Sequence, residues 1–507
     1  MKNRKTLIFV FLGVFVLLLC AYFFAVVPLT KTPEPAETTP ETSLVPGEVS
    51  GHGGRVQMFD QITSEYVKTL YVKNEHGSYK FVRGDNGLVL EGHENLLVDP
   101  ERFAQMVVNA GYTLSTFNAA VTEEDFYKYG LTPEESETYF VLESTTGRRH
   151  IVYIGDKTPA GDGYYARYEG RNAIYVLDDS IENDLLAPSS NLIRPLLAYP
   201  SAINTYYLMQ TFLLGRGEDV FIGAEYLDPD KRSDLAAMSV HRLTYPAEYP
   251  AGTNYDDVLT RFCDFSGSKT VAIDLDDATL EKFGLLKPAY TLYAVNAETD
   301  DDGNPVGLIE NYITFSEKQQ DESGSYFYYA ASYTFGIIAR VEQITVDFLE
   351  WELEKWVSPN IFQINIQKVK SLAFESADVS VTFELSGADN DSLRVVEKET
   401  GHAPEMKNFR QLWKVLLSVT QEGPAELYGQ SIGDLTADES NLLFTMTVVT
   451  RAGVEQVYKF YPYTDRRVYY TVNGEGAFYV NRTMLNKVLS DVQRVMRDET
   501  VDSEARY

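Results

Sequence analysis

The stretch DPERFAQMVVNAG, Asp99–Gly111, opens a unit that recurs along the chain, and the fold can be read outward from it. Apolar residues recur in this stretch at intervals of three and four, which predicts an amphipathic helix. These residues are Phe103, Met106, Val107 and Ala110. Pro100 suits the first position of a helix, and Gly111 suits its end. We therefore expect a helix that begins at Pro100 and buries one face.

The same apolar spacing occurs twice more, at nearly equal distances along the chain. The second copy is Tyr255, Val258, Leu259 and Phe262, and the third is Phe409, Leu412, Trp413 and Leu416. An aromatic residue and a glycine follow each helix, and they indicate a short helix or turn that ends at the glycine. The pairs are Tyr129–Gly130, Phe283–Gly284 and Tyr428–Gly429. This recurrence predicts three copies of one structural unit.

Each copy also contains a strand with paired tyrosines, then a further strand and a closing helix. The tyrosine pairs are Tyr164–Tyr165, Tyr328–Tyr329 and Tyr469–Tyr470, and the closing helices are expected near Asp179, Val341 and Asn481. Short segments between these markers alternate apolar and polar residues, as strands do. The order of elements predicts an α+β fold: three tandem units of antiparallel sheet with helices on one face. The tyrosines favour cross-strand pairing over sugar binding.

A run of twenty-one residues without a charge, LIFVFLGVFVLLLCAYFFAVV, extends from Leu7 to Val27. As a helix this run spans about 32 Å, close to the hydrocarbon thickness of a bilayer. Its length and the bulky residues at its end favour a retained anchor over a cleaved signal or lipid attachment at Cys20. Three cationic residues precede the run, so we expect a single-pass protein with its N-terminus inside and its bulk outside the cytoplasmic membrane.

Residues 31–55 are rich in Pro, Thr and Glu and end in glycines, which indicates an extended tether that cannot form a core. The sequence therefore predicts five segments. They are an N-terminal transmembrane anchor at 1–30, the tether at 31–55, and repeat units at 56–195, 196–358 and 359–507.

The composition limits the possible partners. The formal net charge is −30, and such an acidic surface is repelled by nucleic acid and by anionic lipid headgroups. The acidity is explained by the solubility of a large exported protein. Only two cysteines occur, Cys20 and Cys263. With one of them in the predicted anchor, the exterior part cannot form an intramolecular disulfide and depends on packing.

One sequence motif suggests catalysis. Residues 429–433, GQSIG, match the G-x-S-x-G pattern of a nucleophile elbow, which requires a strand before the serine, a helix after it and a histidine later in the chain. We expect neither a buried strand before this motif nor a helix after it. No histidine follows Ser431. We therefore interpret the motif as a chance match.

The other candidate motifs also lack the residues that their chemistry needs. In the acidic turn Asp300–Asn304, a calcium loop would place Ile309 where a bidentate Glu is required, so a hairpin tip is the better interpretation. Asp274, Asp276 and Asp277 resemble a turn that caps a helix at 278–283. The histidines are too scattered for zinc, and no phosphate-binding loop is present. The sequence thus predicts no catalytic, cofactor-binding or metal-binding residues, and no ATP hydrolysis by this chain.

Four segments of the first copy, taken together, resemble a known bacterial family. They are the helix at 100–111, EEDFYKYGLTP (Glu123–Pro133), RRHIVYIGD (Arg148–Asp156) and GYYARYEGRNAIYVLDD (Gly163–Asp179). The family is the domain-of-unknown-function family 4340, and the resemblance covers about residues 60–195 and is weaker in the later copies. Members look like single-span membrane proteins with extracytoplasmic repeats, and some are encoded beside gliding-motility-type or other ABC transporter subunits. The resemblance implies an accessory role and assigns no catalytic residue.

We therefore expect a membrane-anchored, extracytoplasmic, non-catalytic interaction protein. Its implied role is that of an accessory subunit of an ABC-type, gliding-motility-like transport complex, with integral membrane transporter subunits as partners. Several similar units can hold one partner through multivalency. The alternative is a cell-envelope polysaccharide-binding protein or an envelope hydrolase. That alternative requires a concave pocket, and hydrolysis requires two acidic residues about 5–10 Å apart in it.

Overall fold

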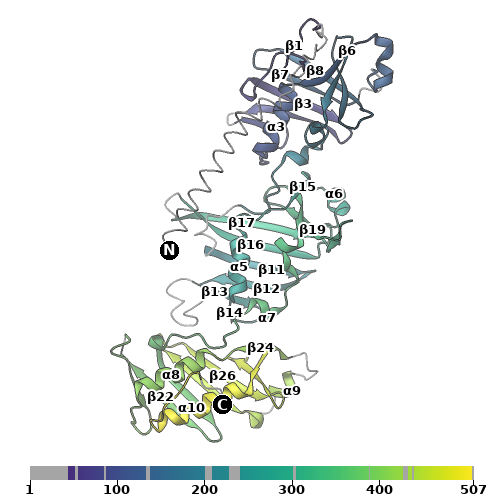
Figure 1. Ribbon diagram of the computed structural model, residues 1–507. Helices are drawn as coiled ribbons and strands as arrows, with labels where there is room; N and C mark the ends of the chain where they lie inside the picture. Colours follow the sequence, from purple (N-terminus) through teal and green to yellow (C-terminus); the bar gives the residue numbers. More distant parts are fainter. Residues whose placement is uncertain are drawn as a thin grey trace, which may run out of the picture. The chain divides into compact units, whose positions relative to one another are not determined.

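The computed structural model describes residues 44–51, 55–84, 87–132, 137–199, 208–227, 240–300, 304–387, 389–425, 432–436 and 439–504. These residues form three antiparallel sheets together with helices (Figure 1). The predicted mixed fold with antiparallel sheets is confirmed. In the described part of the chain, no helix combines the length and apolar character that crossing a bilayer requires. The predicted anchor at 7–27 lies outside the described residues.

The first sheet has the strand order β1-β2-β6-β10-β9-β8-β7-β3-β4-β5. Its strands are β1 (Val49–Ser50), β2 (Val56–Gln57), β3 (Val67–Asn74), β4 (Gly77–Gly84), β5 (Gly87–Leu90), β6 (Leu114–Ala120), β7 (Tyr139–Ser144), β8 (Arg149–Lys157), β9 (Gly163–Tyr168) and β10 (Ala173–Asp178). A three-stranded meander, β3 to β5, joins a four-stranded meander, β7 to β10. Leu70 pairs with Leu142 at this join. Strand β6 lies between β10 and β2, and β1 forms the edge of the sheet.

The second sheet has the order β14-β13-β12-β11-β16-β17-β19-β20-β15, and the short β18 pairs with β19. Its strands are β11 (Met209–Arg216), β12 (Asp219–Tyr226), β13 (His241–Tyr245), β14 (Tyr249–Pro250), β15 (Lys269–Ala272), β16 (Tyr290–Thr299), β17 (Pro305–Phe315), β18 (Gln319–Gln320), β19 (Tyr326–Ser332) and β20 (Ile337–Glu342). The join between its two meanders, β11 with β16, pairs Phe212 with Ala294.

The third sheet has the order β23-β22-β21-β25-β26-β27-β28-β24. Its strands are β21 (Val369–Ser376), β22 (Ser380–Ser386), β23 (Arg394–Glu397), β24 (Gln421–Pro424), β25 (Phe444–Thr450), β26 (Glu455–Pro462), β27 (Arg467–Val472) and β28 (Phe478–Asn481). Its path contains the order found in all three sheets: a first meander, a four-stranded meander, and then a strand taken from between them. The second sheet adds β14 to the first meander, and the first sheet adds β2 and β1 beyond β6. The three sheets therefore share one topology.

One longer helix covers the core face of each sheet, and the residues predicted from the spacing are buried, except Phe103, which is half-buried. The helices are α3 (Pro100–Gly111), α5 (Thr253–Arg261) and α8 (Met406–Leu417). Helix α3 begins at Pro100, as predicted. It ends at Gly111, also as predicted. Close packing requires this glycine as well, because a Cβ atom there would lie 2.2 Å from the carbonyl oxygen of Ile62.

The expectation that helices lie on one face only is wrong, because a short helix covers the opposite face of each sheet. These helices are η4 (Glu123–Tyr129), α6 (Asp277–Lys282) and α9 (Ile432–Thr436). In the second sheet Leu280 packs on Ile338, whereas the next strand residue, Ala339, belongs to the main core. In the third sheet Leu435 packs against the tyrosines of the corresponding face. Gly130 and Gly284 end the first two short helices with positive φ, as predicted; Gly429 lies outside the described residues.

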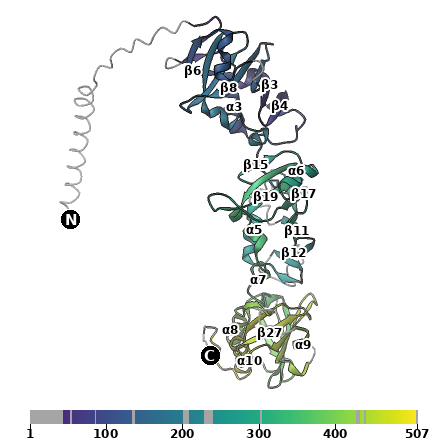
Figure 2. The same ribbon diagram turned by 90° about the vertical axis from the view of Figure 1, so that its right-hand side faces the viewer.

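The closing helices differ between the copies. Only the third is long, α10 (Arg482–Met496), whose cap Asn481 accepts a hydrogen bond from the Thr483 amide at 2.9 Å. It packs beside α8 (Figure 2). The first is the short 3₁₀ helix η5 (Asp179–Asn183). Near Val341 the strand β20 continues, and only η8 (Gln343–Thr345), η9 (Asp347–Glu350) and α7 (Leu353–Trp356) follow. The closing helix expected at Asp179 is therefore present as a short one, whereas the one expected at Val341 is replaced there by the end of β20.

The chain divides into two compact units. The N-terminal unit comprises residues up to Gly92 and Pro100–Pro188, and the C-terminal unit comprises His93–Asp99 and Ser189–Tyr507. The second and third sheets lie in the C-terminal unit and share one continuous hydrophobic core. Isolated backbone bridges, Ala251 with Val357 and Asn360 with Thr420, link the segment between these two sheets to its neighbours.

The end of the predicted tether belongs to the first sheet. Val49–Ser50 form β1, which pairs with β2. The hydroxyl group of Tyr175 donates a hydrogen bond of 2.6 Å to the carboxylate of Glu48, which is buried. The N-terminal unit therefore starts before residue 56, because β1 extends the edge of the sheet formed by β6 and β2.

Candidate functional site

The C-terminal unit contains a cleft with a volume of about 240 Å³, bordered by the second and the third sheet. We call it the junction cleft. It is lined by Leu227, Arg242, Glu248, Tyr249, Pro250, Gln456, Val472, Asn473 and Glu475. A smaller inner chamber of about 50 Å³ shares five of these residues and adds Tyr458 and Tyr470 to the lining. The two spaces form one polar cleft with an aromatic inner end.

Two turns with short strands supply most of the lining. Tyr249 is in β14, which follows the turn after β13, and its ring packs edge-on against Phe478 of β28 at 5.3 Å. The amide of Ser358 donates a hydrogen bond of 2.9 Å to the carbonyl oxygen of Pro250. Asn473 has a φ of +53° in the turn after β27. Its side-chain oxygen accepts a hydrogen bond of 2.9 Å from the Val457 amide. Both walls of the cleft are therefore fixed by backbone contacts.

The single cation of the cleft lining is held by carboxylates. A terminal nitrogen of Arg242 lies 2.7 Å from Glu225 and the other lies 3.3 Å from Glu248. The carboxylate of Glu475 adds a second acidic group to the lining. With one arginine against Glu248 and Glu475, the lining carries an excess of negative charge.

Two of the three phenol groups at the inner end, those of Tyr249 and Tyr470, make no hydrogen bond among the described residues. Tyr249 and Tyr470 are only 5% and 3% exposed. Burial, and then the neighbouring Tyr469 and Glu475, raise the pKa of Tyr249, so its phenol remains protonated. Burial likewise raises the pKa of Tyr470, with Tyr249 as the next cause. Tyr458 differs, since its hydroxyl group donates to the side-chain oxygen of Gln456 at 3.0 Å.

This arrangement offers both donors and acceptors to a small ligand. The amide groups of Gln456 and Asn473 use their oxygen atoms internally, which leaves their NH₂ groups as donors. Glu475 is an acceptor, and a phenol is both donor and acceptor. A small pocket with convergent polar groups is the usual form of a ligand site. The cleft is the concave surface that the polysaccharide alternative requires.

The sequence missed this site because its walls come from distant parts of the chain. Asn473–Gly474 is a recognisable hairpin turn, and this was the one local signal for the rim. Both members of the predicted pair Tyr469–Tyr470 pack across the strands, Tyr469 against Tyr461 at 6.4 Å and Tyr470 against Phe460 at 6.2 Å. The other tyrosine pairs follow the structural expectation. Tyr165 packs on Tyr129 and Tyr329 packs on Phe283, each pair of ring centres 4.8 Å apart.

The G-x-S-x-G motif at 429–433 has regular secondary structure on both sides. Helix α9 begins at Ile432, which corrects the prediction that no helix follows the motif. Strand β24 precedes the motif, but only one of its four residues is buried. Ser431 itself lies outside the described residues. His402, the last histidine of the chain, lies 3.4 Å from Asp498.

The acidic segments occupy turns, as predicted. Asp276 caps α6 by accepting a hydrogen bond of 2.7 Å from the Thr279 amide. Asp300 accepts one of 2.8 Å from the Asn304 amide at the tip of the β16–β17 hairpin, of which residues 301–303 lie outside the described part. Across the described ranges, no three His, Cys, Asp or Glu side chains gather closely enough to hold a metal ion.

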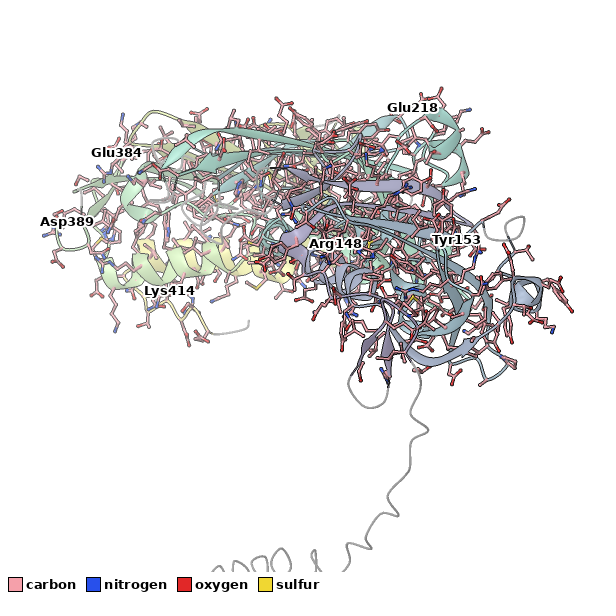
Figure 3. All side chains as sticks on the ribbon, turned by 90° about the horizontal axis from the view of Figure 1, so that it is seen from above. Arg148, Tyr153, Glu218, Glu384, Asp389 and Lys414 are labelled. Carbon is pink, nitrogen blue, oxygen red and sulfur yellow. The ribbon has the colours of Figure 1, made fainter. Side chains whose placement is uncertain are left out.

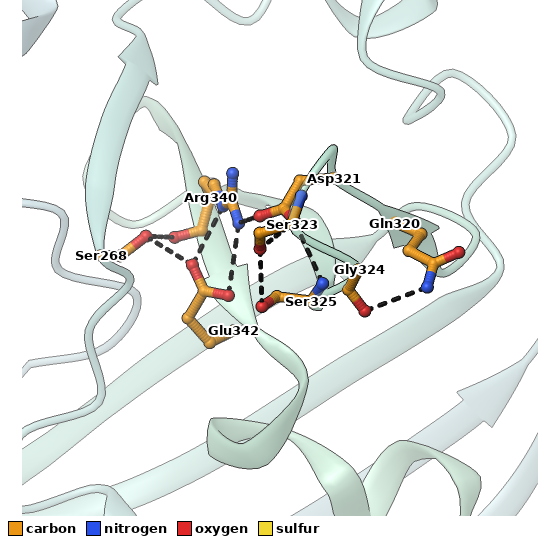
Figure 4. Close-up of polar contacts among 8 residues, drawn as sticks. All are labelled: Ser268, Gln320, Asp321, Ser323, Gly324, Ser325, Arg340 and Glu342. Atoms are coloured by element: carbon orange, nitrogen blue, oxygen red, sulfur yellow. Dashed lines mark hydrogen bonds and ion pairs between the residues drawn. The ribbon is translucent and has the colours of Figure 1, made fainter.

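A second polar cluster lies on the second sheet and fixes a hairpin (Figure 4). Arg340 contacts Asp321 at 2.6 Å and Glu342 at 3.0 Å, and its guanidinium group stacks on the ring of Phe327. Asp321 also accepts hydrogen bonds from the turn that ends at Ser325, and these bonds together with Arg340 hold its pKa well below the usual range. All of its strong contacts are internal, so we interpret this cluster as structural.

The comparisons with known proteins agree with the resemblance seen in the first copy. The family model "Domain of unknown function (DUF4340)" matches residues 89–202. This match confirms the resemblance to DUF4340 for that segment, which begins in β5 and so leaves out β3 and β4, part of the expected range. Neither curated proteins nor solved structures gave a match to the chain. The matched segment does not include the junction cleft.

Proposed function

We propose that this chain is a membrane-anchored, extracytoplasmic and non-catalytic interaction protein, an accessory subunit of an ABC-type, gliding-motility-like transport complex. The match to DUF4340 at residues 89–202 carries the proposal, because the resemblance to that family implies such a role. The uncharged run at 7–27 supports the membrane location.

The repeated architecture supports an interaction role. Three sheets of one topology present similar strand edges and turns, and similar surfaces can bind one partner assembly at several points. The net charge of −30 favours partner surfaces that are neutral or basic. A transporter with basic extracytoplasmic loops would satisfy both conditions.

The experiment is crosslinking of the full-length protein in its native bacterial membranes, followed by affinity purification and identification of the crosslinked proteins. The matched control keeps residues 1–55 and lacks 56–507, so that it retains the anchor and tether alone. The proposal expects a permease and its ATPase with the full chain and neither with the control.

Recovery of wall polysaccharide without any transporter subunit would contradict the proposal, as would recovery of the protein alone. Recovery of the same transporter with the control would assign the contact to the anchor and would also contradict it. Raising the salt concentration should reduce the yield of the complex, since exposed charge contacts are screened.

A further inference from the structure

We infer that the junction cleft is a binding site for one neutral, polyhydroxylated ring, a hexose unit. The ligand would lie between Tyr249 on one wall and Asn473 and Glu475 on the other. This inference does not rest on the transport role, since the cleft would bind such a ring whether or not the chain joins a transporter.

The hydrogen-bonding groups of the cleft select the chemical class of the ligand. A hydroxyl group can donate to a carboxylate and accept from an amide at the same time. The cleft supplies such pairs, with Glu475 as acceptor beside the NH₂ groups of Asn473 and Gln456 as donors. An apolar ligand would leave these groups without partners, which is costly for groups removed from water.

Charge excludes the ionic alternatives. A phosphate or carboxylate ligand would meet two carboxylates, Glu248 and Glu475, and an arginine that is already paired with Glu225 and Glu248. An amine would satisfy the carboxylates but would leave the donors of Gln456 and Asn473 unused. A neutral ring with several hydroxyl groups uses both kinds of group.

The two buried phenols supply the independent observation that points to a ligand. Tyr249 and Tyr470 are more than nine-tenths buried, and both line the inner chamber. Neither hydroxyl group makes a hydrogen bond among the described residues, and neither oxygen is fully enclosed by protein, so both reach the space of the chamber. Buried polar groups in folded proteins are normally hydrogen-bonded. A ligand hydroxyl group entering from the wider part of the cleft would satisfy them.

The size of the cleft limits the ligand to one ring. Its volume of about 240 Å³ is below the roughly 300–1,000 Å³ of sites for drug-sized ligands. Asn473 and Glu475 are exposed at its rim, so the cleft is open on that side. A sugar bound there could therefore be free or could be the end of a longer chain.

The test is a titration of the full-length protein in a detergent without a sugar headgroup, because maltoside detergents would compete. The probes are methyl β-D-glucoside, N-acetylglucosamine and chitotetraose, measured by saturation-transfer NMR and calorimetry. Two cleft variants, Tyr249→Phe and Glu475→Gln, remove one hydrogen-bonding function each with little change in shape. We expect binding of at least one probe and a fivefold to tenfold loss of affinity in each variant.

The matched controls remove equivalent groups elsewhere in the same unit. Tyr255→Phe removes a hydroxyl group that is also buried without a partner, and Glu218→Gln changes an exposed carboxylate on the β11–β12 turn (Figure 3). Both controls should bind the probes like the unaltered protein. They also report any general loss of folding, because each belongs to the C-terminal unit.

The outcomes separate the possibilities. If chitotetraose binds more tightly than the single sugars, the ligand of the site is the end of a polysaccharide. If all bind equally, the ligand is a free sugar. Absence of binding by all three probes would overturn the inference. Binding that the two cleft variants leave unchanged would also overturn it, since the sugar would then lie elsewhere.

Discussion

The ammonium group of Lys487 lies 2.8 Å from a carboxylate oxygen of Asp491, and both side chains are buried within α10. The lysine also donates a hydrogen bond of 2.8 Å to the carbonyl oxygen of Asp502. A buried ion pair contributes little net stability, but loss of one partner leaves the other charge uncompensated. Lys487 therefore links the C-terminal segment to α10, and breaking the ion pair should cost a large part of the free energy of unfolding.

The substitution Lys487→Met should lower the free energy of unfolding of the C-terminal unit by about 3–5 kcal/mol. The double variant Lys487→Met with Asp491→Leu should recover most of this loss, because it removes both charges. Urea unfolding of the full-length protein followed by tryptophan fluorescence measures the effect. All three tryptophans, Trp351, Trp356 and Trp413, belong to the C-terminal unit, so the signal reports that unit alone.

The control for this prediction is Lys414→Met, on the neighbouring helix α8. Lys414 is exposed on the side of α8 away from the sheet (Figure 3). Its substitution should change the free energy of unfolding by less than about 1 kcal/mol. If both variants lost the same free energy of unfolding, the cause would be the removal of a positive charge and not the loss of the buried pair.

The helices were predictable from sequence because their signal is local. The stripe through Phe409 and Leu412 recurs within a few residues and specifies a buried face whatever lies opposite. The strands β6, β15 and β24, which pair with the last strand of each second meander, were not predictable in the same way. Each pairs with a strand that follows it by at least fifty residues, such as β24 with β28, and no local pattern encodes that pairing.

The burial of charged residues was not predictable either. Lys487 and Asp491 belong to residue types that are almost never fully buried unless paired, and the structure buries them as a pair. The junction cleft was hidden for a related reason, since Tyr249 and Glu475 are polar surface-type residues from different sheets. When the residues of a site come from distant segments, they form no motif of regular spacing that could be recognised in the sequence.

Asp184 makes the stability of the N-terminal unit depend on pH. Burial raises its pKa to about 6, and hydrogen bonds from the Leu185 amide and the Asn109 side chain offset part of this effect. Between its ordinary pKa near 4 and the raised value, the folded state holds a proton that the unfolded state has lost. The free energy of unfolding should therefore fall by roughly 3 kcal/mol as the pH rises through this range.

The measurement is hydrogen exchange of peptides from the N-terminal unit at several pH values, corrected for the intrinsic rate. Asp184→Asn should remove the dependence between pH 4 and 6. Asp179→Asn, an exposed neighbour in η5, serves as the control and should keep it. A pH dependence that survives in Asp184→Asn would assign the effect to another group.

Gly155 allows η4 to cross the outer face of the first sheet. A Cβ atom at this position would lie 2.2 Å from the carbonyl oxygen of Tyr129 and 2.9 Å from the side chain of Leu131. Gly155→Ala should therefore destabilise the N-terminal unit by about 1–3 kcal/mol. Protection of η4 peptides from hydrogen exchange should fall first. Gly147→Asn is the control, because this turn has open space and a left-handed φ that asparagine tolerates.

Arg340 holds the β18–β19 turn against the sheet through Asp321, and its loss should release that turn (Figure 4). In Arg340→Met the apolar part of the side chain remains on Phe327, while both ion pairs disappear. We expect hydrogen exchange of residues 319–325 to rise about tenfold or more, because the bonds that Asp321 makes to the turn lose their anchor. Lys269→Met, on the neighbouring strand β15, removes an exposed cation and should leave this exchange unchanged. Equal exchange in the two variants would mean that the turn is held by the bonds from Asp321 to Ser323 and Ser325 alone.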